Sequence, residues 1–391
     1  MIHLIYYSPE MLETGGAETL LLRIGRKYVS DGTRAELICR NISHELKQEF
    51  INAGIQVPES EGSLETKISD FDNKDIILCV TLFEFLETEY YRQKNHLDCR
   101  NFLYVLHPNT MDPDHSLESN ILKKNVIKRT VEKYAANGNI LFMDGITMAS
   151  AEKMLNCSFS GMSDLRFDIP LDIVPFDAEN TAKKAESKNF GILSVLRAEF
   201  PFKGYVFGLI RLYTELKKTY PYVTLTLISS GDNYKELEEK VETAGGTDAG
   251  ITLINGATNA DLPYYYKKCS LYAGMGTTVL EAVQYGAISI VVTPYTFEFK
   301  SDHFFHEAPD LVASGENAPE ATSKVREILD MKSDEFVSTA IDAYRKLEAR
   351  YSIESFANRL NTRVIRSDEA LFSKLYMELH FAKNRIRKLI R

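Results

Sequence analysis

Short apolar runs alternate with longer amphipathic stretches along the first part of the chain. The first run covers residues 2–7, and a loop with Gly15 and Gly16 separates it from a helical pattern of leucines. Four further runs follow, separated by stretches of helical length, at residues 35–39, 75–80, 102–106 and 140–143. This alternation of strand and helix patterns predicts a parallel sheet with helices on both faces.

The same alternation resumes after a polar stretch. Residues 177–188 (DAENTAKKAESK) lack apolar periodicity and predict a linker. Five more strands are expected after it, at residues 190–196, 223–228, 251–254, 271–273 and 288–292. We therefore expect an α/β protein of two Rossmann-like, doubly wound domains, 1–176 and 189–350, whose carboxyl edges face an interdomain cleft.

Three helical patterns close the chain, at about residues 334–350, 352–365 and 368–390. We assign residues 351–391 to C-terminal helices that can cross back to the first domain. The last helix is basic and amphipathic, which suits either an anionic membrane surface or packing against protein. Its apolar face carries Leu371, Leu375, Leu379, Ala382, Ile386 and Leu389.

Composition limits the kind of protein further. At 391 residues, the chain is longer than one hydrophobic core usually supports, which agrees with two domains. The net charge of -9 argues against a general nucleic-acid binder. A run of about 18 apolar residues and a signal-peptide pattern are both missing from the sequence, so we expect a cytoplasmic protein.

The cysteines and histidines do not indicate a metal site. Five scattered cysteines without a CxxC pair fit neither a disulfide framework nor a structural zinc site, and we expect them to be reduced and mostly buried. His303 and His306, preceded by Asp302, have a spacing that can hold a metal. Because a third clustered ligand is lacking, we interpret them as part of a surface loop and expect no metal.

The segment LYAGMGTTVLEAVQYG at residues 271–286 is the most informative one. It predicts a short strand, a glycine loop and the start of a helix. Gly274 and Gly276 let the backbone approach a ligand, and the amides of Thr277 and Thr278 begin the helix, where partial positive charge favours phosphate. A diphosphate fits this arrangement.

Three charged residues extend this candidate site. Glu281 lies about one turn into the helix and can accept hydrogen bonds from a ribose. Alternatively, its charge only stabilises the first turns of the helix. Arg197 and Lys203, in SVLRAEFPFKG, follow the first strand of the second half and can neutralise a leaving diphosphate. Their alternative is a solvated loop.

The order of several motifs resembles the retaining family-four glycosyltransferases of GT-B fold. The resemblance covers most of the chain and runs through GGAE at 15–18, RAEFPFKG at 197–204, LEAVQYG at 280–286 and YSIESFANR at 351–359. It implies that a UDP- or GDP-sugar donor is bound, and that the sugar is transferred with retention to a glycan or lipid-linked acceptor. It also implies a role in bacterial surface polysaccharide or glycoconjugate synthesis, at the inner face of the membrane.

The resemblance also implies roles for individual residues. The first glycine loop would approach the donor phosphates, while Arg197 and Lys203 would hold the diphosphate. Glu281 would bind the ribose. His107, at the end of NFLYVLH, matches a position where such enzymes often place a histidine near the transferred sugar, whereas a lone histidine after a strand is otherwise more often structural. Because cations and helix amides would stabilise the leaving diphosphate, neither a metal nor another cofactor is implied.

One position departs from the family pattern. The family commonly has two glutamates eight residues apart. The second corresponds to Glu281, and the position of the first is occupied here by Ala273. Loss of a charge-assisted hydrogen bond costs about 1.5 to 3 kcal/mol, roughly 10- to 100-fold in binding or rate. An unusual donor, a substitute contact and a lost activity all stay open.

Other functions are compatible with the same pattern of elements. Ala273 motivates a regulatory protein that binds nucleotide sugars without transferring them. A nicotinamide-dependent oxidoreductase is disfavoured because neither glycine loop reads GxGxxG. An epimerase or a phosphorylase is a weaker alternative, and no cofactor-lysine motif supports the latter. Tyr264, Tyr265 and Tyr266 can stack on a base, but packing within a helix is the favoured interpretation.

Overall fold

The protein was analysed as a computed structural model. It describes residues 1–365 except 8–10, 14, 59–70, 73, 112–120, 188–189, 259–260 and 314–317. The chain divides into two compact units. Unit 1 comprises Met1–Asp172 and the chain from Tyr351 onward, and unit 2 comprises Ile173–Arg350. The predicted last helix at 368–390 lies outside the described residues.

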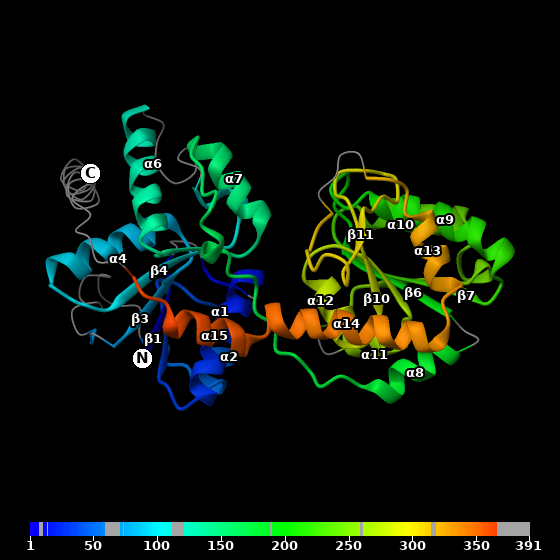
Figure 1. The fold of residues 1–391 in the computed structure, drawn as a ribbon, viewed down its shortest axis with the longest axis horizontal. Coiled ribbons are helices and arrows are strands. Elements are labelled where there is room, and N and C mark those ends of the chain that lie inside the picture. Colours follow the sequence, from blue (N-terminus) through cyan, green and yellow to red (C-terminus); the bar gives the residue numbers. More distant parts are fainter. Residues whose placement is uncertain are drawn as a thin grey trace. The chain divides into compact units, whose positions relative to one another are not determined.

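Unit 1 contains a five-stranded parallel sheet in the order β2-β1-β3-β4-β5 (Figure 1). Its strands are β1 (Ile2–Tyr6), β2 (Ala35–Cys39), β3 (Ile76–Cys79), β4 (Arg100–Val105) and β5 (Ile140–Phe142). Its described helices are α1 (Gly16–Ser30), α2 (His44–Asn52), α4 (Leu82–Lys94), α6 (Ile121–Ala136), α7 (Gly145–Leu155), α15 (Ile353–Thr362) and the 3-10 helices η1 (Pro108–Met111) and η2 (Ser163–Leu165).

Alternation along the strands of unit 1 supplies two separate cores. Ile5 and Ile77 face α4, α6 and α7, whereas Leu4 and Leu78 face α1, α2 and α15. Because successive residues of a strand point to opposite faces, a strand buried on both faces is apolar at nearly every position. This explains the continuous apolar runs in the sequence.

Unit 2 contains a six-stranded sheet in the order β11-β10-β9-β6-β7-β8, parallel except for β11. Its strands are β6 (Phe190–Arg197), β7 (Val223–Ser230), β8 (Ile251–Asn255), β9 (Leu271–Gly274), β10 (Ile288–Val291) and β11 (His303–Phe304). Its described helices are α8 (Ala178–Glu186), α9 (Tyr205–Thr219), α10 (Tyr234–Thr243), α11 (Leu262–Lys268), α12 (Thr277–Gln284), α13 (Thr322–Leu329), α14 (Ser333–Tyr351) and the 3-10 helix η3 (Gly246–Ala249).

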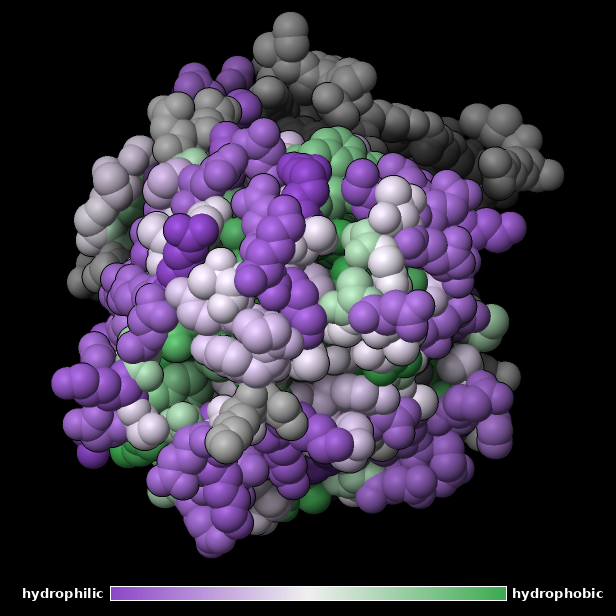
Figure 2. Space-filling model, turned by 90° about the vertical axis from the view of Figure 1, so that its right-hand side faces the viewer, coloured by the Kyte–Doolittle hydropathy of each residue, from purple (hydrophilic) through white to green (hydrophobic). Residues whose placement is uncertain are grey.

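Helices cover both faces of the unit 2 sheet as well. α9, α10 and α13 lie on one face and α11 and α12 on the other (Figure 1). The first group packs on a continuous apolar cluster that includes Leu209, Leu237 and Val325. Hydrophilic side chains cover most of the outer face seen in Figure 2. The prediction of two doubly wound α/β domains is confirmed.

The polar stretch at 177–188, predicted as a linker, instead contains α8 and belongs to unit 2. Lys184 explains the difference, because its ammonium group is buried and donates to the carbonyls of Tyr266 (3.0 Å) and Tyr285 (2.6 Å). These carbonyls lie in α11 and directly after α12, so one lysine joins three helices. An apolar pattern cannot reveal a helix that is held by a polar side chain.

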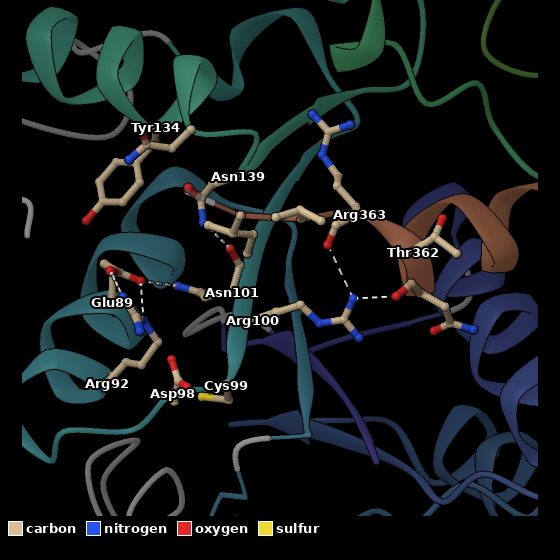
Figure 3. A pocket seen from close by; sticks show the side chains of 14 residues that line it. Glu89, Arg92, Asp98, Cys99, Arg100, Asn101, Tyr134, Asn139, Thr362 and Arg363 are labelled. Carbon is tan, nitrogen blue, oxygen red and sulfur yellow. Dashed lines mark hydrogen bonds and ion pairs between the residues drawn. The ribbon is translucent and has the colours of Figure 1, made fainter. Parts of the chain in front are cut away.

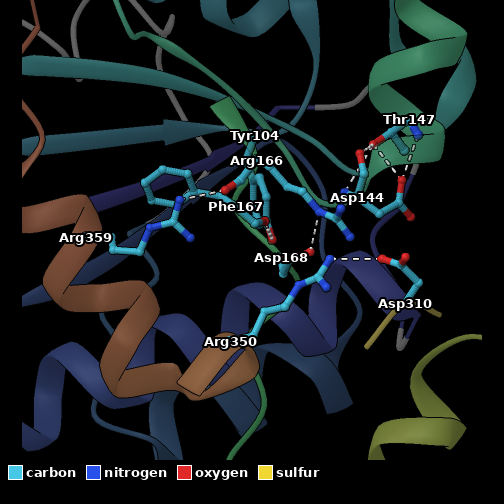
Figure 4. A network of polar contacts seen from close by, with 9 residues as sticks. All are labelled: Tyr104, Asp144, Thr147, Arg166, Phe167, Asp168, Asp310, Arg350 and Arg359. Carbon is cyan, nitrogen blue, oxygen red and sulfur yellow. Dashed lines mark hydrogen bonds and ion pairs between the residues drawn. The ribbon is translucent and has the colours of Figure 1, made fainter. Parts of the chain in front are cut away.

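Residues from Tyr351 onward return to unit 1, where α15 packs on α1. The ring of Phe356 packs against those of Tyr104 and Phe167, with ring centres 5.4 Å and 5.7 Å apart, respectively. Arg359 donates to the carbonyl of Arg166 at 2.6 Å and lies over the Phe167 ring (Figure 4). Aromatic packing and hydrogen bonds therefore fasten α15 to the sheet of unit 1.

The end of α15 is fixed beside a polar cavity of about 350 Å3, at the amino ends of β4 and β5 (Figure 3). Arg100 donates to the carbonyls of Leu360, Asn361 and Arg363. On the other wall, Glu89 accepts hydrogen bonds from Arg92. The polar groups of this cavity serve largely to hold the structure together, and it lies at the opposite edge of the sheet from the predicted glycine loop.

Candidate functional site

The order of strands in unit 2 creates one point where the connections diverge. From β6 the chain proceeds to β7 and β8 on one side, while β9 and β10 lie on the other. In open α/β sheets, ligands bind beyond the carboxyl ends of the strands at such a switch point. The loops after β6 and β9 flank it, and they are the two loops that the sequence singled out.

Arg197 and Lys203 lie in the loop that follows β6. Arg197 is the last residue of the strand and is exposed, with one guanidinium nitrogen 3.4 Å from the carboxylate of Glu199. Lys203 is half-buried, its ammonium group lies 5.3 Å from the centre of the Phe202 ring, and burial lowers its pKa to about 8. The loop therefore carries two cations, one exposed beside Glu199 and one half-buried beside the Phe202 ring.

Neighbouring loops hold the β6 loop in place. The amide of Ala198 donates to the carbonyl of Ser230, the last residue of β7, at 2.6 Å. The amide of Tyr295, which follows β10, donates to the carbonyl of Phe202 at 3.1 Å. A Cβ on Gly204 would lie 2.8 Å from the carbonyl oxygen of Thr296. Glycine is thus required there for close packing at the start of α9.

The loop after β9 begins α12 as predicted. Gly276 has a φ of +78°, a conformation that favours glycine, and no side chain caps the helix. The amide of Gly276 donates to the carbonyl of Leu311 at 2.7 Å, so it is already engaged. Among the described residues, the amides of Thr277 and Thr278 have no such acceptor and remain the amides that can meet an anion.

The structure gives a reason for a glycine at position 274 that differs from the predicted close approach of a ligand. A Cβ at this position would lie 2.6 Å from the hydroxyl oxygen of Tyr272, so the phenol ring fills the space under the loop. That hydroxyl donates to Oγ1 of Thr278 at 2.6 Å. Ala273 is fully buried in the core of unit 2, next to Ile290 of β10, and its side chain is not at the surface of the site.

Glu281 is half-buried one turn into α12. One of its carboxylate oxygens accepts a hydrogen bond from the hydroxyl of Tyr266 at 2.9 Å. Tyr266 is fully buried in α11, whereas Tyr264 of the same helix is 56% exposed. The sequence does not reveal this bond, because residues 15 apart meet only through the packing of two helices.

The predicted residues of unit 1 lie at the carboxyl edge of their own sheet. Gly15 precedes α1 and Gly16 is its first residue, in the connection that follows β1. His107 is exposed, follows β4, and its carbonyl accepts the amide of Thr110 at 3.0 Å. β3 separates the two strands, so both predicted features share one edge of one sheet.

The two histidines whose spacing can hold a metal form other contacts. His303 lies in β11 rather than in a loop, and its ring bonds to Asp302, while His306 stacks on Phe304. Within the described ranges, no three His, Cys, Asp or Glu side chains are grouped to hold a metal. The five cysteines are all free thiols, and all but Cys157 are buried. None of the helices in the described part of the chain has the length and apolar content that crossing a bilayer requires.

Comparisons with known proteins identify the fold. No protein-family model and no curated protein sequence matches the chain. Solved structures match over nearly its whole length. HepE of Anabaena in complex with UDP has a TM-score of 0.62 at 16% identity, over 92% of this chain and 98% of that chain. A glycosyltransferase of Rickettsia africae has a TM-score of 0.61 at 12% identity, over 92% of this chain and 96% of that one.

A third match is a trehalose-6-phosphate synthase studied for glycosyl transfer with retention. Its TM-score is 0.52 at 13% identity, over 93% of this chain and all of that chain. At such low identities the likeness establishes the class of fold. The chain has the two-domain α/β architecture of the GT-B fold.

Proposed function

We propose that the protein is a glycosyltransferase that moves a sugar from a nucleotide-diphosphate sugar to a glycan or lipid-linked acceptor, with retention of configuration. One observation carries the proposal: two cations, an uncapped helix N-terminus and a carboxylate gather at the switch point of unit 2. A nucleoside diphosphate presents the complementary groups, two phosphates and a ribose diol. The GT-B fold supplies the context in which such a site serves sugar transfer.

The donor site would be divided among these residues. Arg197 and Lys203 would neutralise the diphosphate, and the amides of Thr277 and Thr278 would add hydrogen bonds at the positive end of α12. Glu281 would accept the ribose hydroxyls. A uridine nucleotide is the first candidate because HepE, of similar fold, binds UDP and glucose; GDP is the alternative.

In the reaction, the bond between the sugar's anomeric carbon and the diphosphate breaks, and the acceptor oxygen bonds to the same face of that carbon. The acceptor's proton passes to the departing phosphate oxygen. Protein cations and helix amides would stabilise the developing charge, so we propose a metal-independent transfer with no further cofactor. Transfer that persists in EDTA would support this point, and loss restored by Mg²⁺ would refute it.

Unit 1 would supply the acceptor side. The loop of Gly15 and Gly16 would approach the donor phosphates, and His107 would lie near the transferred sugar. We further propose that the acceptor belongs to a bacterial surface polysaccharide or glycoconjugate, and that the chain acts at the inner face of the cell membrane. The basic helix expected at residues 368–390 would provide the contact with anionic lipid.

Ala273 favours one alternative, a regulatory protein that binds nucleotide sugars without transferring them. The residue is a buried alanine of the core, so no carboxylate is present at the position where the family has one for the donor sugar. Release of UDP from a UDP-sugar in the presence of an acceptor, with a new glycoside as product, would exclude this alternative.

Thermal-shift titration tests the donor site first. UDP, GDP, ADP and their common sugar conjugates are added to the wild type and to Glu281→Ala. Ligand at 100 times its dissociation constant stabilises the folded state by about 2.7 kcal/mol, so a bound nucleotide raises the melting temperature measurably. We expect one nucleotide to stabilise the wild type, and Glu281→Ala to lose most of that shift. Failure of every nucleotide to stabilise the wild type would overturn the proposed function.

A further inference from the structure

We propose that Tyr266 is a positioning residue that orients the carboxylate of Glu281 toward the ribose of a bound nucleotide. The inference rests on the proposed function and deepens it. Its basis is one partly buried hydrogen bond, 2.9 Å long, between the phenol hydroxyl of Tyr266 and Oε2 of Glu281. α11 and α12, which carry the two residues, pack directly against each other.

The tyrosine side of this bond is rigid. Tyr266 is fully buried, and its ring stacks on that of Tyr285 with an angle of 8° between the planes. Its carbonyl accepts a hydrogen bond from the buried ammonium group of Lys184, which also binds the carbonyl of Tyr285. Both the backbone and the ring of Tyr266 are therefore fixed relative to α12.

The carboxylate side benefits from that rigidity. A half-buried glutamate has three rotatable side-chain bonds, and each must be fixed before two hydroxyls can bind. A carboxylate has about four acceptor positions, and the phenol takes one of them, so this hydrogen bond does not exclude binding of a vicinal diol. The phenol thus fixes the direction of Glu281 before the nucleotide arrives, and lowers the entropy lost on binding.

The arrangement also explains which of the three consecutive tyrosines matters. Tyr264 is largely exposed and its hydroxyl is bonded to Lys268 of the same helix, away from Glu281. Tyr266 is the one whose hydroxyl reaches α12. The three tyrosines can therefore affect nucleotide binding through Tyr266, without any of their rings stacking on a base.

The test is a double-mutant cycle of Tyr266→Phe and Glu281→Ala, with Tyr264→Phe as the matched control. Affinities are measured by calorimetry for UDP, for 2′,3′-dideoxy-UDP and for inorganic pyrophosphate; GDP or ADP and its dideoxy form replace UDP if that nucleotide is the one that binds the wild type. Removing one hydrogen bond to a carboxylate should weaken UDP binding by about tenfold in Tyr266→Phe. Tyr264→Phe should leave it unchanged.

The ligand series separates positioning from simple packing. Dideoxy-UDP and pyrophosphate lack the ribose diol, so Tyr266→Phe should change their affinity less than twofold, and should have no further effect on UDP in the Glu281→Ala background. Equal weakening of all three ligands, or additive effects of the two substitutions, would overturn the inference while the donor site stands. Absence of nucleotide binding to the wild type would instead overturn the proposed function, and the inference with it.

Discussion

The two units use one topology with different chemistry at their carboxyl edges. In unit 1, the first strand, β1, lies beside β3, which begins the other half of the sheet. In unit 2, the first strand, β6, lies beside β9 in the same way. The helices that follow β3 and β9, α4 and α12, therefore occupy equivalent places. Comparison of these helices shows why the units are expected to bind different groups.

The start of α4 has a side-chain cap. Oγ1 of Thr81 accepts the amide of Glu84 at 3.3 Å, and the buried carboxyl group of Glu84 accepts the amide of Tyr7, directly after β1. The start of α12 has a glycine cap and no side-chain cap. A helix N-terminus with a side-chain cap and a buried carboxyl group beside it is less suited to an anion than an uncapped one near two cations. The two units share a type of fold, and the donor site that we propose depends on how one helix of unit 2 begins.

The largest expected effect comes from removing a cation at the edge of unit 2. Lys203→Met keeps the length and the apolar contacts of the side chain but loses its charge. Because that charge would stabilise the leaving diphosphate, we expect the rate of sugar transfer to fall by roughly 100- to 1,000-fold. Lys218→Ala, an exposed lysine at the end of α9, is the control. Equal rates for Lys203→Met and the wild type would remove the reason to place the donor here.

A smaller effect is expected at the edge of unit 1. His107→Ala removes an exposed ring after β4, which we place near the transferred sugar. Loss of such a contact should lower the transfer rate by roughly 10- to 100-fold and leave the affinity for UDP within twofold of the wild type. The transfer rate and the UDP dissociation constant are measured for the wild type and for His107→Ala. If His107→Ala weakens UDP binding as much as transfer, the division of tasks between the edges is wrong.

The sequence predicts the strands well because most of them are short apolar runs, and among the described strands only β11, two residues long, is missing. It also places Arg197, Lys203 and the start of α12 at one edge, since the carboxyl ends of parallel strands meet there. What it cannot predict depends on polar contacts between helices. α8 is held by the ammonium group of Lys184, and Glu281 is bonded to Tyr266, and neither contact leaves a periodic pattern.

The buried carboxyl group beside the start of α4 should reveal itself in the pH dependence of stability. Burial raises the pKa of Glu84 to about 8, from an ordinary value near 4.5. The folded chain therefore holds this proton more tightly than the unfolded chain, so the free energy of unfolding falls as pH rises from about 5 toward 8. Glu84→Gln keeps an acceptor for the Tyr7 amide but does not titrate. Relative to the wild type, it should gain about 2 kcal/mol between pH 5 and pH 7.

Urea unfolding of both proteins at pH 5, 6 and 7 measures this difference, and Glu45→Gln, an exposed glutamate in the first turn of α2, serves as the control that should follow the wild type. A parallel pH dependence of Glu84→Gln and the wild type would mean that the carboxyl group is ionised in the folded protein. An ionised Glu84 would place a negative charge beside the start of α4, where unit 2 has cations near the start of α12, so the two helices would differ in charge as well as in capping.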